Sequence, residues 1–268
     1  SSKRYPVTEQ AAARSHLDKA QYEAMYTQSI ENPEEFWAEQ AGSLLHWHEP
    51  WRHVSGGNFA TADSKWFEGA RLNVAYNCID RHLEHRSAQT AIIWEGDDPN
   101  DDALISYKAL HESVCRLANA LKTRGVKKGD RVCIYMPMIP EASYAMLACA
   151  RIGAVHSVVF GGFSPESLKD RILDSDCQVV ITADEGMRGG RAIPLKANVD
   201  LAVADCPAVH TVLVVRRTHA KVAWDDARDL CYHQSTSAQS ADCPIELMAA
   251  EDPLFILYTS GSTGKPKG

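Results

Sequence analysis

Three glycine-rich stretches each follow an apolar run, and their residue types suit the binding of phosphate groups. They are Gly161-Gly162-Phe163 after "AVHSVVF", "ADEGMRGGR" after "QVVIT", and "TSGSTGKPKG" after "LFILY". Glycine permits backbone conformations closed to other residues, so successive amide groups can converge on one anion. Arginine and lysine add positive charge, and the arginine fork can pair two phosphate oxygens. These stretches therefore predict sites for phosphorylated ligands.

The last stretch, "YTSGSTGKPKG" at residues 258–268, has the most specific composition. It combines glycines, hydroxyl donors and two lysines, which together could hold a polyphosphate. It is not a Walker A loop, because proline follows Lys265 and no glycine stands five positions before Gly264. A flexible tail could share this composition, but a buried-type strand leads straight into the stretch, which favours a binding loop.

The elements that must position these stretches alternate regularly after residue 90. The pattern predicts a hairpin over 90–107 and then the strands 131–136, 154–160, 178–182, 211–216 and 254–258, separated by the helices 106–125, 140–153, 164–176 and 193–204. This order predicts an α/β fold with a mostly parallel, doubly wound sheet and flanking helices. Ligands bind such sheets beyond the carboxyl ends of the strands, which is where the glycine-rich stretches lie.

Residues 1–88 show a different pattern and contain four of the six tryptophans. Helix-like stretches such as "LDKAQYEAMYTQSI" occur here, and no segment alternates cleanly enough to predict a strand. We therefore expect a helical and irregular segment over 1–88, followed by an α/β part over 89–268. The tryptophans could form a ligand box, but packing anchors are their commoner use.

Composition excludes several other classes of protein. The formal net charge of -7 argues against a general nucleic-acid binder. None of the eight cysteines forms a CxxC or CxH pair, so we expect no metal site of that kind. The apolar runs are too short for a membrane span. Because the first residues have no signal-peptide pattern, we expect a cytoplasmic protein with reduced thiols.

The final stretch resembles the phosphate-loop signature of the adenylate-forming superfamily, which includes acyl-CoA synthetases, luciferases and peptide-synthetase adenylation domains. Further stretches resemble the AMP-forming acetyl-CoA synthetases in particular: "WFEGARLNVAYNCIDRHL" (66–83), "IIWEGDDP" (92–99), "YMPMIPEA" (135–142), "ACARIGAVHSVVFGGFSPESL" (148–168) and "ITADEGMRGGR" (181–191). The similarity extends over roughly residues 20–268. The resemblance thus implies the first part of the large domain of such an enzyme.

The resemblance also implies which residues bind ligands. For coenzyme A these are Phe160, Gly161, Gly162, Arg188, Gly189, Gly190 and Arg191. For the ATP phosphates they are Thr259, Ser260, Gly261, Ser262, Thr263, Gly264, Lys265, Lys267 and Gly268. Without the resemblance, a solvated basic turn at Arg188 and Arg191 and an ordinary strand-to-helix turn at Gly161-Gly162 would be the simpler interpretations.

The reaction that the resemblance implies joins acetate to coenzyme A at the expense of ATP, with Mg²⁺ held mostly by phosphates and water. Acetate would attack the α-phosphorus to give acetyl-adenylate and pyrophosphate. The CoA thiol would then attack this mixed anhydride, giving acetyl-CoA and releasing AMP. The parts that hold the adenine, select the acid and supply the adenylation lysine would follow Gly268. We therefore assign no catalytic residue within this chain and expect the chain alone to be inactive.

Two alternatives stay open. One is a ligase for propionate or another short acid, and the other is a non-catalytic module that binds coenzyme A or nucleotide. For an acetate ligase and for a ligase of another short acid alike, the partners would be small molecules: the acid, ATP and coenzyme A. A sheet that ends after residue 258 would also expose an edge, so we expect some self-association there.

Overall fold

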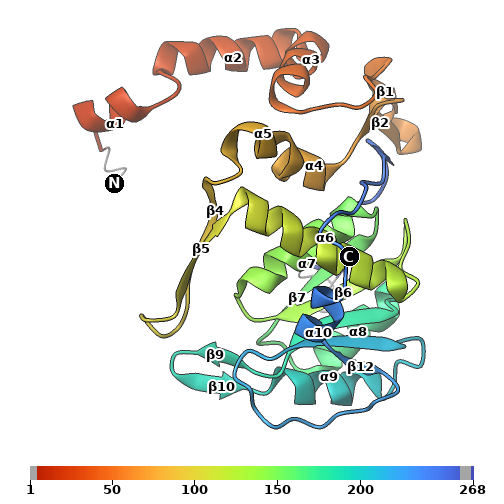
Figure 1. The fold of residues 1–268 in the computed structure, drawn as a ribbon. Helices are drawn as coiled ribbons and strands as arrows, with labels where there is room; N and C mark the ends of the chain where they lie inside the picture. The colour runs from red at the N-terminus through yellow and green to blue at the C-terminus, as the bar shows by residue number, and fades with distance from the viewer. Residues whose placement is uncertain (1–4, 260–266) are drawn as a thin grey trace. The chain divides into compact units, whose positions relative to one another are not determined.

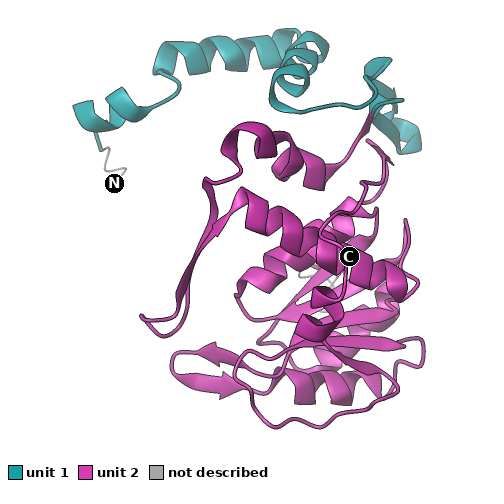
Figure 2. Ribbon diagram, viewed as in Figure 1, with its two compact units in different colours: residues 1–70 teal, residues 71–268 magenta. Residues whose placement is uncertain are grey.

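A computed structural model describes residues 5–259 and 267–268 of the chain. Two compact units divide at residue 70, with unit 1 covering Ser1–Ala70 and unit 2 covering Arg71–Gly268 (Figure 2). The segment boundary after residue 88 that the sequence predicts stays a prediction. No helix among the described residues combines the length and the apolar character that crossing a membrane requires.

Unit 1 consists of three helices followed by a β-hairpin. Its elements are α1 (Glu9–Arg14), α2 (Lys19–Glu31), α3 (Pro33–Leu44), β1 (His53–Asn58), η1 (Phe59–Thr61) and β2 (Asp63–Glu68). The indole rings of Trp47 and Trp51 and the ring of Phe67 pack with centroids 5.2 to 5.3 Å apart. Packing is thus the use of these two tryptophans.

The hairpin of unit 1 differs from the expected helical and irregular segment. β1 and β2 pair antiparallel from His53↔Glu68 to Asn58↔Asp63. The sequence of β1, "HVSGGN", has no apolar alternation, and five of its six residues are exposed or half-buried. Cross-strand hydrogen bonding rather than a buried face therefore defines these strands, which is why the pattern of apolar residues did not predict them.

Unit 2 begins with short elements and a long hairpin before the main sheet. These are β3 (Arg71–Leu72), α4 (Val74–Cys78), η2 (Asp80–His82), α5 (Leu83–Arg86), β4 (Thr90–Glu95) and β5 (Asp102–Ser106). β4 and β5 pair antiparallel, as the sequence predicts. In Figure 1 this yellow hairpin projects away from α6 and reaches toward β9 and β10.

The main sheet of unit 2 has six parallel strands in the order β12-β11-β8-β6-β7-β14. They are β6 (Arg131–Met136), β7 (Val155–Phe160), β8 (Val179–Ala183), β11 (Thr211–Val215), β12 (Asp229–Cys231) and β14 (Phe255–Ile256). Nearly every residue of β6, β8 and β11 is buried, so these strands are the continuous apolar runs that a sheet covered on both faces requires. The predicted α/β fold is confirmed.

The helices that accompany the main sheet lie within two residues of their predicted bounds, except α10, which the sequence did not predict. They are α6 (Tyr107–Thr123), α7 (Pro140–Arg151), α8 (Pro165–Ser175), α9 (Leu195–Val203) and α10 (Tyr232–Ser237). Ser106 caps α6 and Ser164 caps α8 through hydrogen bonds from backbone amides, and Gly125 follows α6 with a φ of 84°. The polar stretch 233–244 starts within α10.

The helices that follow β6 and β7 belong to different layers. α7 packs on α6 and α4, whereas α8 packs on α9 (Figure 1). The chain therefore leaves the carboxyl ends of β6 and β7 in opposite directions. Such a reversal opens a crevice beyond the carboxyl ends of the two strands. Doubly wound sheets bind their ligands in this crevice.

Candidate functional site

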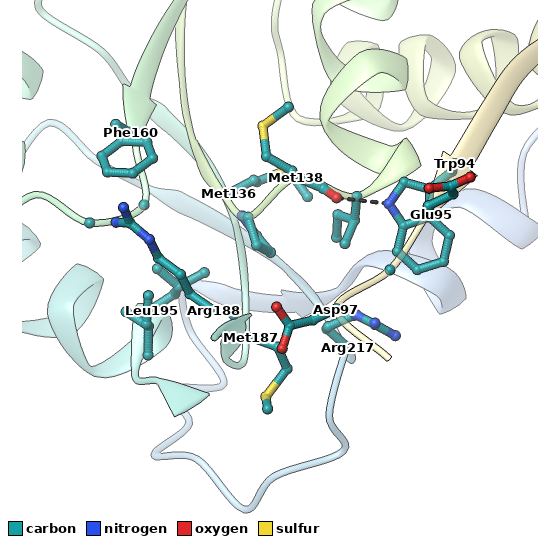
Figure 3. A pocket seen from close by; sticks show the side chains of 17 residues that line it. Trp94, Glu95, Asp97, Met136, Met138, Phe160, Met187, Arg188, Leu195 and Arg217 are labelled. Carbon is teal, nitrogen blue, oxygen red and sulfur yellow. Dashed lines mark hydrogen bonds between the residues drawn. The ribbon is translucent and has the colours of Figure 1, made fainter. Parts of the chain in front are cut away.

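A cavity of about 370 Å³ lies in this crevice (Figure 3). Its walls come from the segments after β6, β7 and β8, with a fourth wall from the end of β4. Phe160, Gly161, Gly162 and Arg188 all line it. Two stretches that the sequence assigns to coenzyme A, separated by about one strand and one helix, therefore meet at one cavity.

The turn after β7 is held from below by a buried tyrosine. The hydroxyl of Tyr135, a fully buried residue of β6, donates to the carbonyl of Phe163 at 2.7 Å. The side-chain amide of Asn198 donates to the same hydroxyl at 3.1 Å. A side chain at Gly161 would place its Cβ 3.1 Å from the Met136 carbonyl oxygen, so the close approach of the two segments requires glycine.

The stretch "GMRGGRAI" forms a tight hairpin that the sequence did not predict. β9 (Gly186–Arg188) and β10 (Arg191–Ile193) pair antiparallel with Arg188 opposite Arg191. Gly189 and Gly190 form the two-residue turn with φ values of 55° and 72°, which only glycine adopts readily. The Arg188 guanidinium lies 5.3 Å from the centroid of the Phe160 ring, at the wall of the cavity (Figure 3).

The β4–β5 hairpin closes another side of the cavity through several polar contacts. The indole of Trp94 donates to the Met138 carbonyl at 2.8 Å, and the Arg217 guanidinium lies 5.1 Å from a Trp94 ring centroid. Arg217 also pairs with the carboxylate of Asp101. At the tip, Asp97 accepts hydrogen bonds from the Gly189 and Gly190 amides at 3.1 and 3.0 Å. Of these residues, the sequence singled out only Gly189 and Gly190.

A buried carboxylate joins the segments after β8 and β11. Oδ1 of Asp184, which is fully buried, accepts from the backbone amides of Glu185, Arg217 and Thr218 at 2.8, 2.8 and 3.2 Å. Within the described residues its Oδ2 has no hydrogen-bond partner. Asp184 thereby fixes the backbone from which the Arg217 side chain extends toward Trp94.

The residues assigned to the ATP phosphates follow β14 at the same edge of the sheet. Thr259 and Lys267 pair through two backbone hydrogen bonds of 3.0 and 3.1 Å, so the two ends of the stretch meet. Ser260, Gly261, Ser262, Thr263, Gly264 and Lys265 lie outside the described residues. Among the described ones, Thr259, Lys267 and Gly268 do not line the cavity.

Helix α8 contacts both predicted binding stretches. The Arg171 guanidinium lies 4.7 Å from the Phe163 ring centroid and 5.2 Å from that of Tyr258. The Tyr258 hydroxyl donates to Asp174 at 2.6 Å. Burial, followed by the contact with Asp174, raises the pKa of Tyr258, which keeps the phenol protonated as the donor. One helix thus supports the turn after β7 and the segment after β14.

The histidines and acidic residues offer no metal centre within the described ranges. No group of three or more histidine, cysteine, aspartate or glutamate side chains is placed there to hold a metal ion. His156 of β7 is buried, and its Nδ1 has no hydrogen-bond partner among the described residues. Burial lowers the pKa of His156 to about 4, so the ring is neutral.

Comparisons with known proteins identify the family of the chain. The model of the AMP-binding enzyme family matches residues 79–268, and the chain belongs to that family. Its earlier part, residues 22–78, matches the model described as the acetyl-coenzyme A synthetase N-terminus. The resemblance to the AMP-forming acetyl-CoA synthetases that the sequence shows is therefore confirmed.

Individual relatives narrow the resemblance further. Acetyl-coenzyme A synthetase 2 of Pseudomonas aeruginosa is 64% identical over 98% of this chain, and the enzyme of the same name from Pseudomonas putida is 63% identical over 99%. The chain covers 41% of the length of each. Among solved structures, acetoacetyl-CoA synthetase from Streptomyces lividans matches with a TM-score of 0.84 and 28% identity, covering 95% of this chain and 39% of that one.

Proposed function

We propose that the whole protein is an AMP-forming acetate–CoA ligase that uses ATP, coenzyme A and Mg²⁺ in the cytoplasm. The observation that carries the proposal is the meeting of Phe160–Gly162 and Arg188 at one cavity beyond the carboxyl ends of parallel strands. Relatives named acetyl-coenzyme A synthetase share about three fifths of the residues over nearly the entire chain, which supports acetate as the acid.

The residues of this chain would contribute binding and electrostatic stabilisation. Arg188 and Arg191 stand opposite each other on a rigid hairpin, so their guanidinium groups can pair the phosphates of coenzyme A. The residues from Thr259 to Gly268 would neutralise the ATP phosphates while acetate attacks the α-phosphorus. Mg²⁺ prefers oxygen ligands and retains water, so it would arrive bound to the phosphates.

The cytoplasmic assignment rests on the cysteines. All eight are free thiols, and six of them are buried. Burial raises the pKa of Cys149 to about 12 and that of Cys177 to about 11, so these thiols are protonated and unreactive. Such a set of unpaired cysteines is typical of proteins from reducing compartments.

Coenzyme A binding by the chain itself gives the most direct test. Calorimetry should detect binding, and Arg188→Ala or Arg191→Ala should weaken it by about tenfold or more, because each removes a charge-assisted contact to phosphate. Arg124→Ala is the matched control, since this exposed arginine at the end of α6 does not line the cavity. Equal affinities of all four proteins would reject the assignment of the cavity.

Activity and substrate are tested separately. We expect acetate-dependent exchange between ATP and pyrophosphate from the full-length protein but not from this chain alone. The likeness to an acetoacetyl-CoA synthetase favours one alternative, a different short-chain acid. Comparing acetate, propionate and acetoacetate in the full-length protein decides between them, and coenzyme A binding without any ligase activity would identify a binding module instead.

A further inference from the structure

The tip of the β4–β5 hairpin contacts the turn between β9 and β10 through one carboxylate. Asp97 Oδ1 accepts from the Gly189 amide at 3.1 Å, and Oδ2 accepts from the Gly190 amide at 3.0 Å. The two contacts bridge segments more than ninety residues apart in the sequence. In Figure 3 the Asp97 carboxylate lies between the side chains of Arg188 and Arg217.

These hydrogen bonds change the role of the two glycines. Their amides are the ones that a two-residue turn leaves without a strand partner, so they are free to bind an anion. In this structure a carboxylate of the same chain already uses both amides. A Cβ at either glycine would meet no atom within 4 Å, so the positive φ values rather than close packing require glycine there.

The arginines on either side of the turn depend on this contact for their direction. Arg188 and Arg191 are cross-strand partners, so their side chains leave the hairpin next to each other. The hairpin has only three residues in each strand, and its two turn residues are glycines, which have no side chain to pack. The bidentate contact with Asp97 is thus the feature that fixes the turn against the cavity wall.

The opposite end of the contact is also anchored. Trp94 of β4 is held by the Met138 carbonyl, and Asp101, just before β5, is held by Arg217, so segments that follow β6 and β11 fix the hairpin on both sides of its tip. Asp97 lies between these two anchors in the sequence. It therefore connects a hairpin docked on the sheet to a hairpin that presents arginines.

From this geometry we propose that Asp97 is a positioning residue: its carboxylate binds the Gly189 and Gly190 amides and so directs Arg188 and Arg191 toward the phosphates of coenzyme A. The proposal rests on the proposed function, because it takes coenzyme A as the ligand. It moves Gly189 and Gly190 from direct contact with the ligand to a supporting role.

A second possible role for Asp97, as a competitor of the ligand, predicts the opposite change in the affinity for coenzyme A when Asp97 is removed. If the two amides were themselves the phosphate site, the Asp97 carboxylate would compete with the ligand, and its removal would tighten binding. If Asp97 positions the arginines, its removal loosens the turn and weakens binding. The direction of the change therefore separates the two roles.

The first measurement needs no ligand. Asp97→Ala and Asp97→Asn are compared with Asp102→Ala and Asp102→Asn, which change the same charge in the same hairpin at an exposed residue that does not line the cavity. Amide hydrogen exchange at Gly189 and Gly190 should accelerate about five- to tenfold in Asp97→Ala and less in Asp97→Asn, which keeps one acceptor. Unchanged exchange in Asp97→Ala would overturn the proposal.

The second measurement is calorimetry with coenzyme A on the same proteins. We expect the dissociation constant to rise about five- to tenfold in Asp97→Ala, by a smaller factor in Asp97→Asn, and not in the Asp102 variants. Tighter or unchanged binding in Asp97→Ala overturns the positioning role. If the unmodified chain binds no coenzyme A while exchange still accelerates, the assignment of the cavity to coenzyme A fails and Asp97 keeps only its role in fixing the turn.

Discussion

Replacing Tyr135 by phenylalanine should destabilise unit 2 and loosen the turn that forms one wall of the cavity. The ring of Tyr135 is fully buried, and its hydroxyl lies between the Phe163 carbonyl at 2.7 Å and the Asn198 amide at 3.1 Å. Phenylalanine keeps the packing of the ring and removes only the hydroxyl. The variant therefore isolates the hydrogen bonds from the hydrophobic contribution.

The expected size of the effect follows from what the hydroxyl leaves behind. A buried hydrogen bond contributes about 1 kcal/mol net, and a partner left unsatisfied costs about 1–3 kcal/mol. Both the Phe163 carbonyl and the Asn198 amide lose their partner, although Phe163 is exposed and Asn198 half-buried, so water can compensate in part. We expect the free energy of unfolding to fall by about 2 kcal/mol.

Urea denaturation at neutral pH measures this change, with Tyr107→Phe as the control because Tyr107 is only half-buried at the start of α6. The control should change stability by less than about 0.5 kcal/mol. Asn198→Ala in both backgrounds completes a double-mutant cycle, which should give a coupling of about 1 kcal/mol. Equal stability of Tyr135→Phe and the control would refute the argument that this hydroxyl holds the turn.

Two further predictions concern pH and the sheet edge. The hydrogen bond with Asp80, followed by that with Cys115, raises the pKa of His111 from 6.5 to about 9. The contribution of protonated His111 to the free energy of unfolding is therefore complete below pH 6.5 and is lost as the pH rises to 9. Allowing for solvent screening, urea titrations should show a loss of about 1–2 kcal/mol over that range, absent in His111→Gln. Phe255 and Leu257 at β14 are 53% and 62% exposed, so we expect self-association that Leu257→Lys reduces in sedimentation experiments; a wild-type chain that stays monomeric would contradict this.

Apart from β12 and α10, the parallel strands and their helices were predictable because their signals are local. The strand 131–136 is predicted and observed with the same bounds, since an uninterrupted apolar run marks a strand buried on both faces. A proline at the first helical position marked the start of α7, and Ser164 followed by Pro165 marked the start of α8. Each of these features depends on residues within one turn or one strand.

The short hairpins could not be predicted in this way, because they are held by contacts between segments that are distant in the sequence. β9 and β10 have three residues each and no buried apolar face, although the Gly189-Gly190 pair is a turn signature that could have indicated a hairpin. The contact between Asp97 and these glycines joins segments ninety-two residues apart, and an acidic residue in a polar turn is ordinarily solvated. The support of the site by Tyr135 and Asp184 is likewise visible only in three dimensions.

The order of the strands has a consequence for the synthesis of the protein. Every residue that lines the cavity lies between Trp94 and Arg217, whereas β14 pairs with β7 through Phe255 and His156 and is the last strand of the described chain. Strands joined by short connections form contacts early, and pairings distant in the sequence form late. On the ribosome, the wall that we assign to coenzyme A can therefore assemble before the stretch that we assign to ATP has been translated, so that a nascent chain acquires its two binding functions one after the other.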